Sequence, residues 1–109
     1  MIKVITLLKR KKGLSLDEFY SYWREKHAPL ALQHNPQMIK YVQNHGVILP
    51  SGEQVYDGVA ETWWPDMHTF QAAVEVLQTE AGKPHLQDLE RFVDFGQMVS
   101  IVTEEKVIK

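Results

Sequence analysis

The chain has 109 residues, 44% of them hydrophobic, and it contains no cysteine. That length indicates one domain, residues 1–109, whose core needs no metal or disulfide, and the lack of thiols excludes thiolate catalysis and zinc–thiolate sites. The formal net charge of −2 gives no electrostatic footprint for nucleic acid. No stretch has the pattern of a signal peptide or a membrane span, so we expect a cytoplasmic protein with no nucleic-acid and no membrane partner.

The first third of the chain predicts a strand followed by a helix. Residues 2–9 are rich in β-branched and aliphatic side chains, which favour a strand. Ser15 and Glu18 have the spacing of a capping box, so a helix should begin there and reach at least His27. Pro29 must either kink this helix or end it and occupy the first turn of a new one.

The rest of the chain predicts a hairpin, helical segments and a last strand. Strands over 39–47 and 55–64 flank turn-forming residues and should pair as a hairpin. Pro65–Asp66 opens a second helix, Pro84 opens a short one, and a strand covers 95–103. The order strand, helix, strand, strand, helix, strand predicts an α+β fold of the ferredoxin-like βαββαβ type, an antiparallel sheet with its helices on one face.

The face of the sheet without helices should be polar if it met water, yet the sequence makes it apolar. In the first strand Ile2, Val4 and Leu8 lie on one face, and Ile5 and Leu7 lie on the other. No third layer remains in the chain to cover the second face. We therefore expect a homodimer that packs sheet on sheet through this open face.

His27 is the first candidate for chemistry. It shares one helix face with aromatic and aliphatic residues, the set being Leu16, Tyr20, Trp23, His27, Leu30 and His34. An imidazole titrates near neutrality, so in a pocket between this helix and the sheet it could act as a general acid or base. Alternatively, its ring packs in the core and a nitrogen bonds the backbone carbonyl that Pro29 leaves free.

Five further residues are candidates for a ligand site. Tyr41 and His45 share a strand face, and Tyr41 could approach His27 and orient a ligand; alternatively both side chains belong to the core and its rim. Asp57 could tune an imidazole or could simply face water. Trp63, like Trp23 on the helix, is a candidate aromatic wall for a flat ligand, with core or dimer packing as the alternative.

The histidines do not have the spacing of a metal site. His27 and His34 lie about 10 Å apart along an uninterrupted helix and cannot hold one ion. His68 and His85 lie near helix starts and should be exposed. We therefore expect no metal and no cofactor. The basic run over 9–12 lacks a Gly-rich phosphate cradle and should be a solvated loop.

Several of these residues also form motifs that resemble the EthD-like proteins of the dimeric α+β barrel superfamily. The helical motif comprises Phe19, Tyr22, Trp23, His27, Ala28, Pro29, Leu30 and Ala31. Further matches are Tyr41, Gln43, Asn44 and His45, then the run over 56–64, and Asp88, Phe92, Val93 and Asp94. The resemblance covers nearly the whole chain and implies the same fold and the same dimer.

The resemblance implies a small hydrophobic or aromatic ligand between the helices and the sheet. The founding member is associated with ether breakdown, fungal relatives are dehydratases or decarboxylases of polyketide pathways, and the superfamily includes isomerases, cofactor-free oxygenases and haem-handling proteins. We therefore expect a cofactor-independent enzyme acting on a carbonyl metabolite, with His27 and Tyr41 catalytic and with Trp23, His45, Asp57 and Trp63 binding the ligand. The alternatives are a cofactor-free monooxygenase, a non-catalytic ligand- or haem-binding module, and a purely structural dimer.

Overall fold

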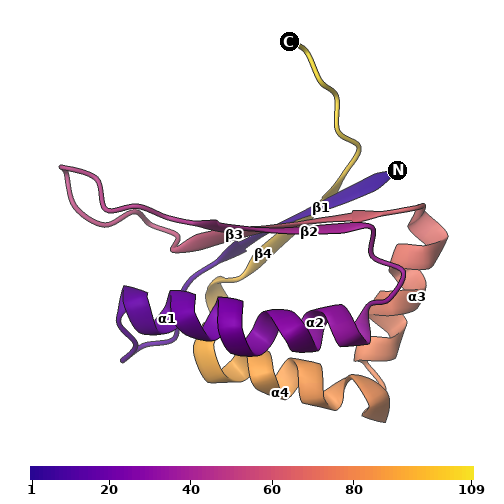
Figure 1. Ribbon diagram of the computed structural model, residues 1–109, viewed down its shortest axis with the longest axis horizontal. Helices are drawn as coiled ribbons and strands as arrows, with labels where there is room; N and C mark the ends of the chain where they lie inside the picture. Colours follow the sequence, from indigo (N-terminus) through magenta and orange to yellow (C-terminus); the bar gives the residue numbers. More distant parts are fainter.

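The computed structural model describes residues 1–109 and has a four-stranded antiparallel sheet with all its helices on one face (Figure 1). The strand order is β2-β3-β1-β4. The strands are β1 (Ile2–Leu8), β2 (Lys40–His45), β3 (Gly58–Trp64) and β4 (Val99–Thr103). This is the ferredoxin-like arrangement that the sequence predicted. No helix is both long enough and apolar enough to cross a membrane.

The first crossover consists of two α-helices joined by a π-helical turn. They are α1 (Leu16–Tyr22), η1 (Trp23–His27) and α2 (Ala28–His34). The capping box forms as predicted, with Ser15 Oγ accepting from the Glu18 N–H and Glu18 accepting from the Ser15 N–H. Pro29 lies in the first turn of α2 and cannot donate to the helix ladder. Just before it the register widens, so that the Ala28 N–H donates to the carbonyl of Trp23, five residues back.

The second crossover packs its last helix against the first crossover. It contains α3 (Met67–Leu77), a short η2 (Glu80–Gly82) and α4 (Lys83–Phe92), which lies beside α1 and α2 in Figure 1. Asp66 caps α3 by accepting from the Thr69 N–H. The side chains of α4 that are buried are His85, Asp88 and Phe92, spaced i, i+3 and i+7. The expectation that His85 is exposed is therefore wrong, because its side of α4 faces the first crossover.

Three predicted strand boundaries, the end of β2 and the starts of β3 and β4, lie further out than the observed ones. The segment between β2 and β3 leaves the ladder because the Asp57 N–H donates to the Leu8 carbonyl instead. The last strand starts at Val99 because residues 95–97 form a 3₁₀ turn, η3, capped by Asp94.

The main core cluster joins both crossovers to the sheet. It contains Leu8, Phe19, Trp23, Phe92 and Val93. The indole of Trp23 is 1% exposed and lies against Gly58, at the start of β3. A side chain at Gly58 would therefore clash with the Trp23 indole.

Replacing Gly58 with alanine should destabilise the fold. The added Cβ would lie 2.6 Å from Trp23 Cζ3 and 3.3 Å from the Asn44 carbonyl oxygen. Since the indole or the neighbouring backbone must shift to admit this Cβ, we expect the free energy of unfolding to fall by about 1–3 kcal/mol in urea denaturation. Gly96→Ala is the control, because its nearest neighbour would lie 3.4 Å away. Equal stability of the two variants would contradict this packing.

The open face of the sheet carries paired apolar side chains. Ile5 is opposite Ile101 and Leu7 is opposite Val99. Ile101 is 54% exposed and Val99 is 42% exposed. Trp63 lies on the same face, with the ammonium groups of Lys3 and Lys40 each 4.8 Å from its ring centroid.

Candidate active site

A cavity of about 330 Å³ lies between the helices and the covered face of the sheet. Its size is at the lower end of the range for small-molecule sites. Most of its lining is hydrophobic, including Trp23, Trp64, Phe70 and Leu77. The polar side chains that line it are Thr6, His27, Asn35, Tyr41, Thr62, His85 and Ser100. An apolar hollow with a few polar groups of this kind suits a hydrophobic ligand that carries one or two oxygens.

His27 lines this cavity at the end of the π-helical turn and is held there by Asp88 of α4. The distance from His27 Nδ1 to Asp88 Oδ2 is 2.9 Å. The other carboxylate oxygen accepts a short hydrogen bond from the Tyr22 hydroxyl. The ring thus bonds to a side chain, and the carbonyl freed by Pro29 is not its partner. The carboxylate fixes the orientation of the ring from 61 residues away.

The pair fixes the protonation of the imidazole. Burial alone would raise the pKa of Asp88, but the hydrogen bonds from Tyr22 and His27 outweigh it, so the pKa lies below its ordinary value. An ionised carboxylate can only accept, which assigns the proton of His27 to Nδ1. Burial lowers the pKa of His27 below 6.5, while Asp88 acts in the opposite direction. At neutral pH, Nε2 is therefore an unprotonated base, and it has no hydrogen-bond partner within the protein.

Tyr41 lines the cavity from β2 and has a free proton. Its hydroxyl oxygen accepts hydrogen bonds from Trp23 Nε1 at 3.0 Å and from Gln43 Nε2 at 3.1 Å. Burial raises the pKa of Tyr41, so the phenol stays neutral. With both lone pairs engaged, the hydroxyl is left to donate its proton, as a ligand oxygen requires.

The family of the chain follows from its sequence match. A family model described as EthD domain matches residues 11–96. The chain belongs to the EthD family. No match was found among curated proteins.

Solved structures share the fold of this EthD protein. An EthD family protein from Bacillus halodurans C-125 is 24% identical, with 97% of this chain and 99% of that chain covered and a TM-score of 0.73. An EthD-like protein from Ralstonia eutropha JMP134 is 18% identical, with 99% and 94% covered and a TM-score of 0.76. SnoaB from Streptomyces nogalater, described as a cofactor-independent oxygenase, is 13% identical, with 98% and 95% covered and a TM-score of 0.65.

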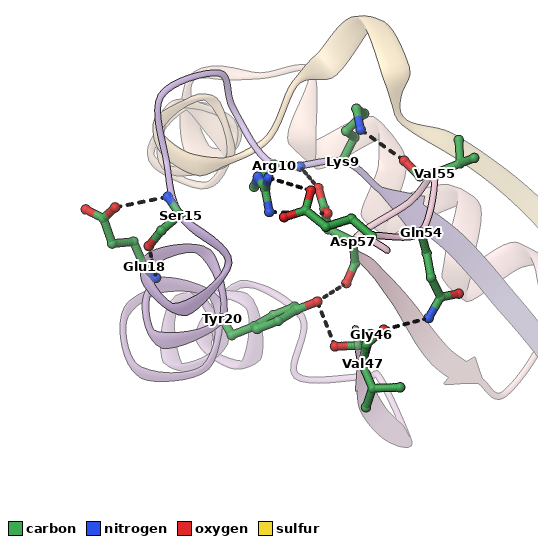
Figure 2. Close-up of polar contacts among 11 residues, drawn as sticks. Lys9, Arg10, Ser15, Glu18, Tyr20, Gly46, Val47, Gln54, Val55 and Asp57 are labelled. Atoms are coloured by element: carbon green, nitrogen blue, oxygen red, sulfur yellow. Dashed lines mark hydrogen bonds and ion pairs between the residues drawn. The ribbon is translucent and has the colours of Figure 1, made fainter. Parts of the chain in front are cut away.

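Two residues expected to bind the ligand lie outside the cavity of this EthD domain. His45 is stacked between Tyr20 and Trp23, with ring centroids 4.6 and 5.1 Å away, and does not line the cavity. Asp57 is 5% exposed, and its carboxylate accepts from the backbone N–H of Arg10 at 2.7 Å. Figure 2 shows the Tyr20 hydroxyl between the carbonyl oxygens of Gly46 and Asp57. Asp57 therefore joins the end of β1 to the β2–β3 connection.

In the basic run before α1, Lys11 and Lys12 are exposed, as expected of a solvated loop, but three of the four cations also contact other parts of the EthD domain. Figure 2 shows Lys9 donating to the carbonyl of Val55 and Arg10 beside Asp57. Arg10 also pairs with Glu53 at 3.0 Å. Lys11 donates to the carbonyl of Glu90. These contacts engage the cations with the protein itself.

Trp64, and not Trp63, is the tryptophan of β3 that faces the cavity of the EthD domain. Adjacent residues of a strand lie on opposite faces, so only one of the two could line it. Trp64 is 4% exposed and packs against Phe70, whereas Trp63 lies on the open face. Trp63, the residue expected to form an aromatic wall, therefore does not line the cavity, and Trp64 does.

His85 and Asp88 are the site residues that sequence reasoning missed. Their spacing with Phe92 marks one face of a helix, and Asp88 belongs to one of the motifs that resembled the family. His85 packs edge-on against His27, with ring centroids 4.9 Å apart. No group of three or more histidine or acidic side chains is arranged to hold a metal ion.

The buried histidines should make the stability of the EthD domain depend on pH. The pKa of His85 is lowered from 6.5 to about 4, by burial first and then by His27 and His34. The folded state therefore binds fewer protons than the unfolded state below pH 6.5. The free energy of unfolding is therefore unaffected by His85 above pH 6.5, and protonation of the unfolded state lowers it by roughly 3 kcal/mol towards pH 4. Urea denaturation at pH 7 and 4.5 should show this loss, and His85→Phe should reduce it; an unchanged dependence in that variant would contradict the assignment.

Proposed function

We propose that the chain is a cofactor-independent enzyme that moves a proton next to the carbonyl group of a hydrophobic or aromatic metabolite. The observation that carries the proposal is the His27–Asp88 pair, which leaves an unprotonated Nε2 at an apolar cavity. Tyr41 supplies a donor for the carbonyl oxygen, and Trp23 and Trp64 form walls for a flat ligand. A base and a hydrogen-bond donor at one cavity are sufficient for general acid–base catalysis.

The proposed step begins with His27. Nε2 removes a proton from the carbon next to the carbonyl, and the electron pair moves to the carbonyl oxygen, which accepts a hydrogen bond from Tyr41. The imidazolium, stabilised by Asp88, then returns the proton. If the proton is returned to another carbon, the product is an isomer. If it is given to a hydroxyl group that leaves the ligand, water is released. In a decarboxylation, Nε2 takes the proton of the carboxylic acid, the bond to the carboxyl carbon breaks and releases carbon dioxide, and its electron pair moves to the neighbouring carbonyl oxygen. The imidazolium then gives the proton to the carbon that carried the carboxyl group.

A cofactor-free oxygenase is the second candidate. The fold is shared with SnoaB, described as a cofactor-independent oxygenase, at a TM-score of 0.65. The same deprotonated ligand would react with dioxygen as the co-reactant. Oxygen consumption that requires the ligand and His27 would favour this reaction over simple proton transfer.

Recovery of the ligand distinguishes an enzyme from a carrier. The purified protein would be incubated with aryl ketones and 1,3-diketones that raise its melting temperature, and the compounds would then be analysed by mass spectrometry. We expect at least one to be isomerised, dehydrated, decarboxylated or oxygenated. Compounds that bind and return unaltered would contradict the enzyme and favour a binding module, and a Soret shift with added haem would identify a haem-binding module.

A homodimer through the open sheet face completes the proposal. Ile5 and Ile101 form an apolar pair at its centre, and Ile101 is 54% exposed in the single chain. A structural neighbour from Bacteroides fragilis NCTC 9343, 8% identical with a TM-score of 0.65, is described as dimeric and ferredoxin-like. Sheet-on-sheet packing would remove these side chains from water.

Replacing Ile101 with arginine should dissociate this dimer. The variant would place a charge at the apolar contact, and we expect association about 100-fold weaker in sedimentation analysis. Gln87→Arg, on the exposed side of α4, should leave the dimer intact. A wild-type monomer at micromolar concentration, or an Ile101→Arg dimer as strong as wild type, would rule out the open sheet face as the interface.

A further inference from the structure

His85 is a buried polar side chain that the proposed step does not use. It is 8% exposed and lines the cavity from the first turn of α4. Neither ring nitrogen has a hydrogen-bond partner in the protein, and Nδ1 is fully enclosed. Buried polar atoms are paired in most folded proteins, so an imidazole left free at the wall of a cavity is a candidate ligand contact.

The surroundings of His85 indicate which of its two ring nitrogens carries the proton. Buried N–H groups without an acceptor are rarer than acceptors without a donor, so the enclosed Nδ1 should carry the lone pair and Nε2 the proton. The ring centroids of His27 and His34 lie 4.9 and 6.0 Å away, and Asp88 is bonded to His27. Burial and the two imidazoles lower the pKa of His85 to about 4. At neutral pH the ring is an uncharged donor through Nε2.

The two hydrogen-bond donors without an acceptor in the protein, the Tyr41 hydroxyl and His85 Nε2, come from different elements. Tyr41 reaches it from the sheet and is bonded to Trp23, one turn before His27. His85 reaches it from α4 and packs on the ring of His27 itself. A ligand that satisfies both donors needs two oxygens, with the proton to be removed close to both. A 1,3-dicarbonyl compound has this arrangement.

We propose that His85 donates a hydrogen bond to a second oxygen of the ligand, so that the site selects 1,3-dicarbonyl compounds over monoketones. This inference rests on the proposed function and names its substrate class. Two flanking carbonyls acidify the carbon between them, and a neutral imidazole whose basicity is reduced by burial needs such an acidified carbon. The negative charge that forms is shared by two oxygens, each with its own donor.

Calorimetry with two matched probes tests the inference. They are 1-phenylbutane-1,3-dione and 1-phenylbutan-1-one, which differ by one oxygen. Wild type should bind the diketone more tightly. His85→Phe should weaken diketone binding by about tenfold, the value of one hydrogen bond, and change monoketone binding less than about twofold. His85→Gln keeps an N–H donor and should recover part of the selectivity, while His68→Phe, at an exposed position outside the cavity lining, should retain all of it.

Equal effects of His85→Phe on both probes, or no effect on either, would overturn the inference. Nitrogen NMR of the wild-type protein gives a second test that needs no variant. The proton of His85 should be on Nε2, and its signal should shift with the diketone and not with the monoketone; a proton on Nδ1 would overturn the inference. Selective binding without any proton exchange at the ligand would refute the proposed function alone, and exchange without selectivity would refute the role of His85 alone.

Discussion

Replacing His27 with glutamine should lower kcat/KM for an enolisable carbonyl compound by about 10²–10⁴-fold, the usual contribution of a general acid–base group. The glutamine amide can still donate to Asp88, so the carboxylate keeps a partner, but the side chain has no basic nitrogen. Steady-state kinetics with a compound that the protein converts measure the loss.

A matched histidine controls for nonspecific effects of this change. His68→Gln alters the same residue type at an exposed position of α3, outside the cavity lining, and should leave kcat/KM within about twofold of wild type. Circular dichroism should show all three proteins folded. A His27→Gln variant that keeps wild-type kcat/KM would refute the proton-transfer role.

Replacing Asp88 with alanine should reduce the free energy of unfolding by about 3 kcal/mol. The carboxylate is 5% exposed and accepts from both Tyr22 and His27. Its removal leaves a buried hydroxyl and a buried imidazole N–H without an acceptor. The ion pair with Arg91 adds little, because that side chain is 68% exposed. Urea denaturation at pH 7 measures the loss.

Asp88→Asn is the matched variant for the charge. Its amide oxygen can accept from His27 while its amino group donates to the Tyr22 oxygen, so we expect a loss of only about 1 kcal/mol. The missing negative charge should lower the pKa of His27 further, since Asp88 acts to raise it. The pH at which kcat/KM falls should then move to more acid values. Equal stability of the alanine and asparagine variants would contradict the hydrogen-bond account.

Local patterns in the sequence predicted much of the fold. The capping box at Ser15, the break at Pro29 and the hairpin signals each depend on neighbouring residues, and the structure has all three. The alternation of apolar residues in β1 predicted the open face correctly. Such features need no knowledge of distant partners.

The partners within the site could not be predicted in the same way. Asp88 is 61 residues from His27, and only the packing of α4 against the π-helical turn joins them. His85 at a helix start has the local pattern of an exposed residue, yet its face of α4 is turned inward. The choice between Trp63 and Trp64 depends on a single residue of register, which sequence alternation alone does not fix.

Deuterium incorporation tests the proton-transfer role of His27 most directly. The protein would be mixed with 1-phenylbutane-1,3-dione in D₂O near neutral pH, the reaction would be stopped with acid after short intervals, and the signal of the protons between the two carbonyls would be followed by NMR. The same measurement without protein gives the buffer rate. Wild type should accelerate the loss of this signal, and His27→Gln should return it to the buffer rate. Exchange at the buffer rate in the presence of bound wild-type protein would contradict His27 as the base of the site.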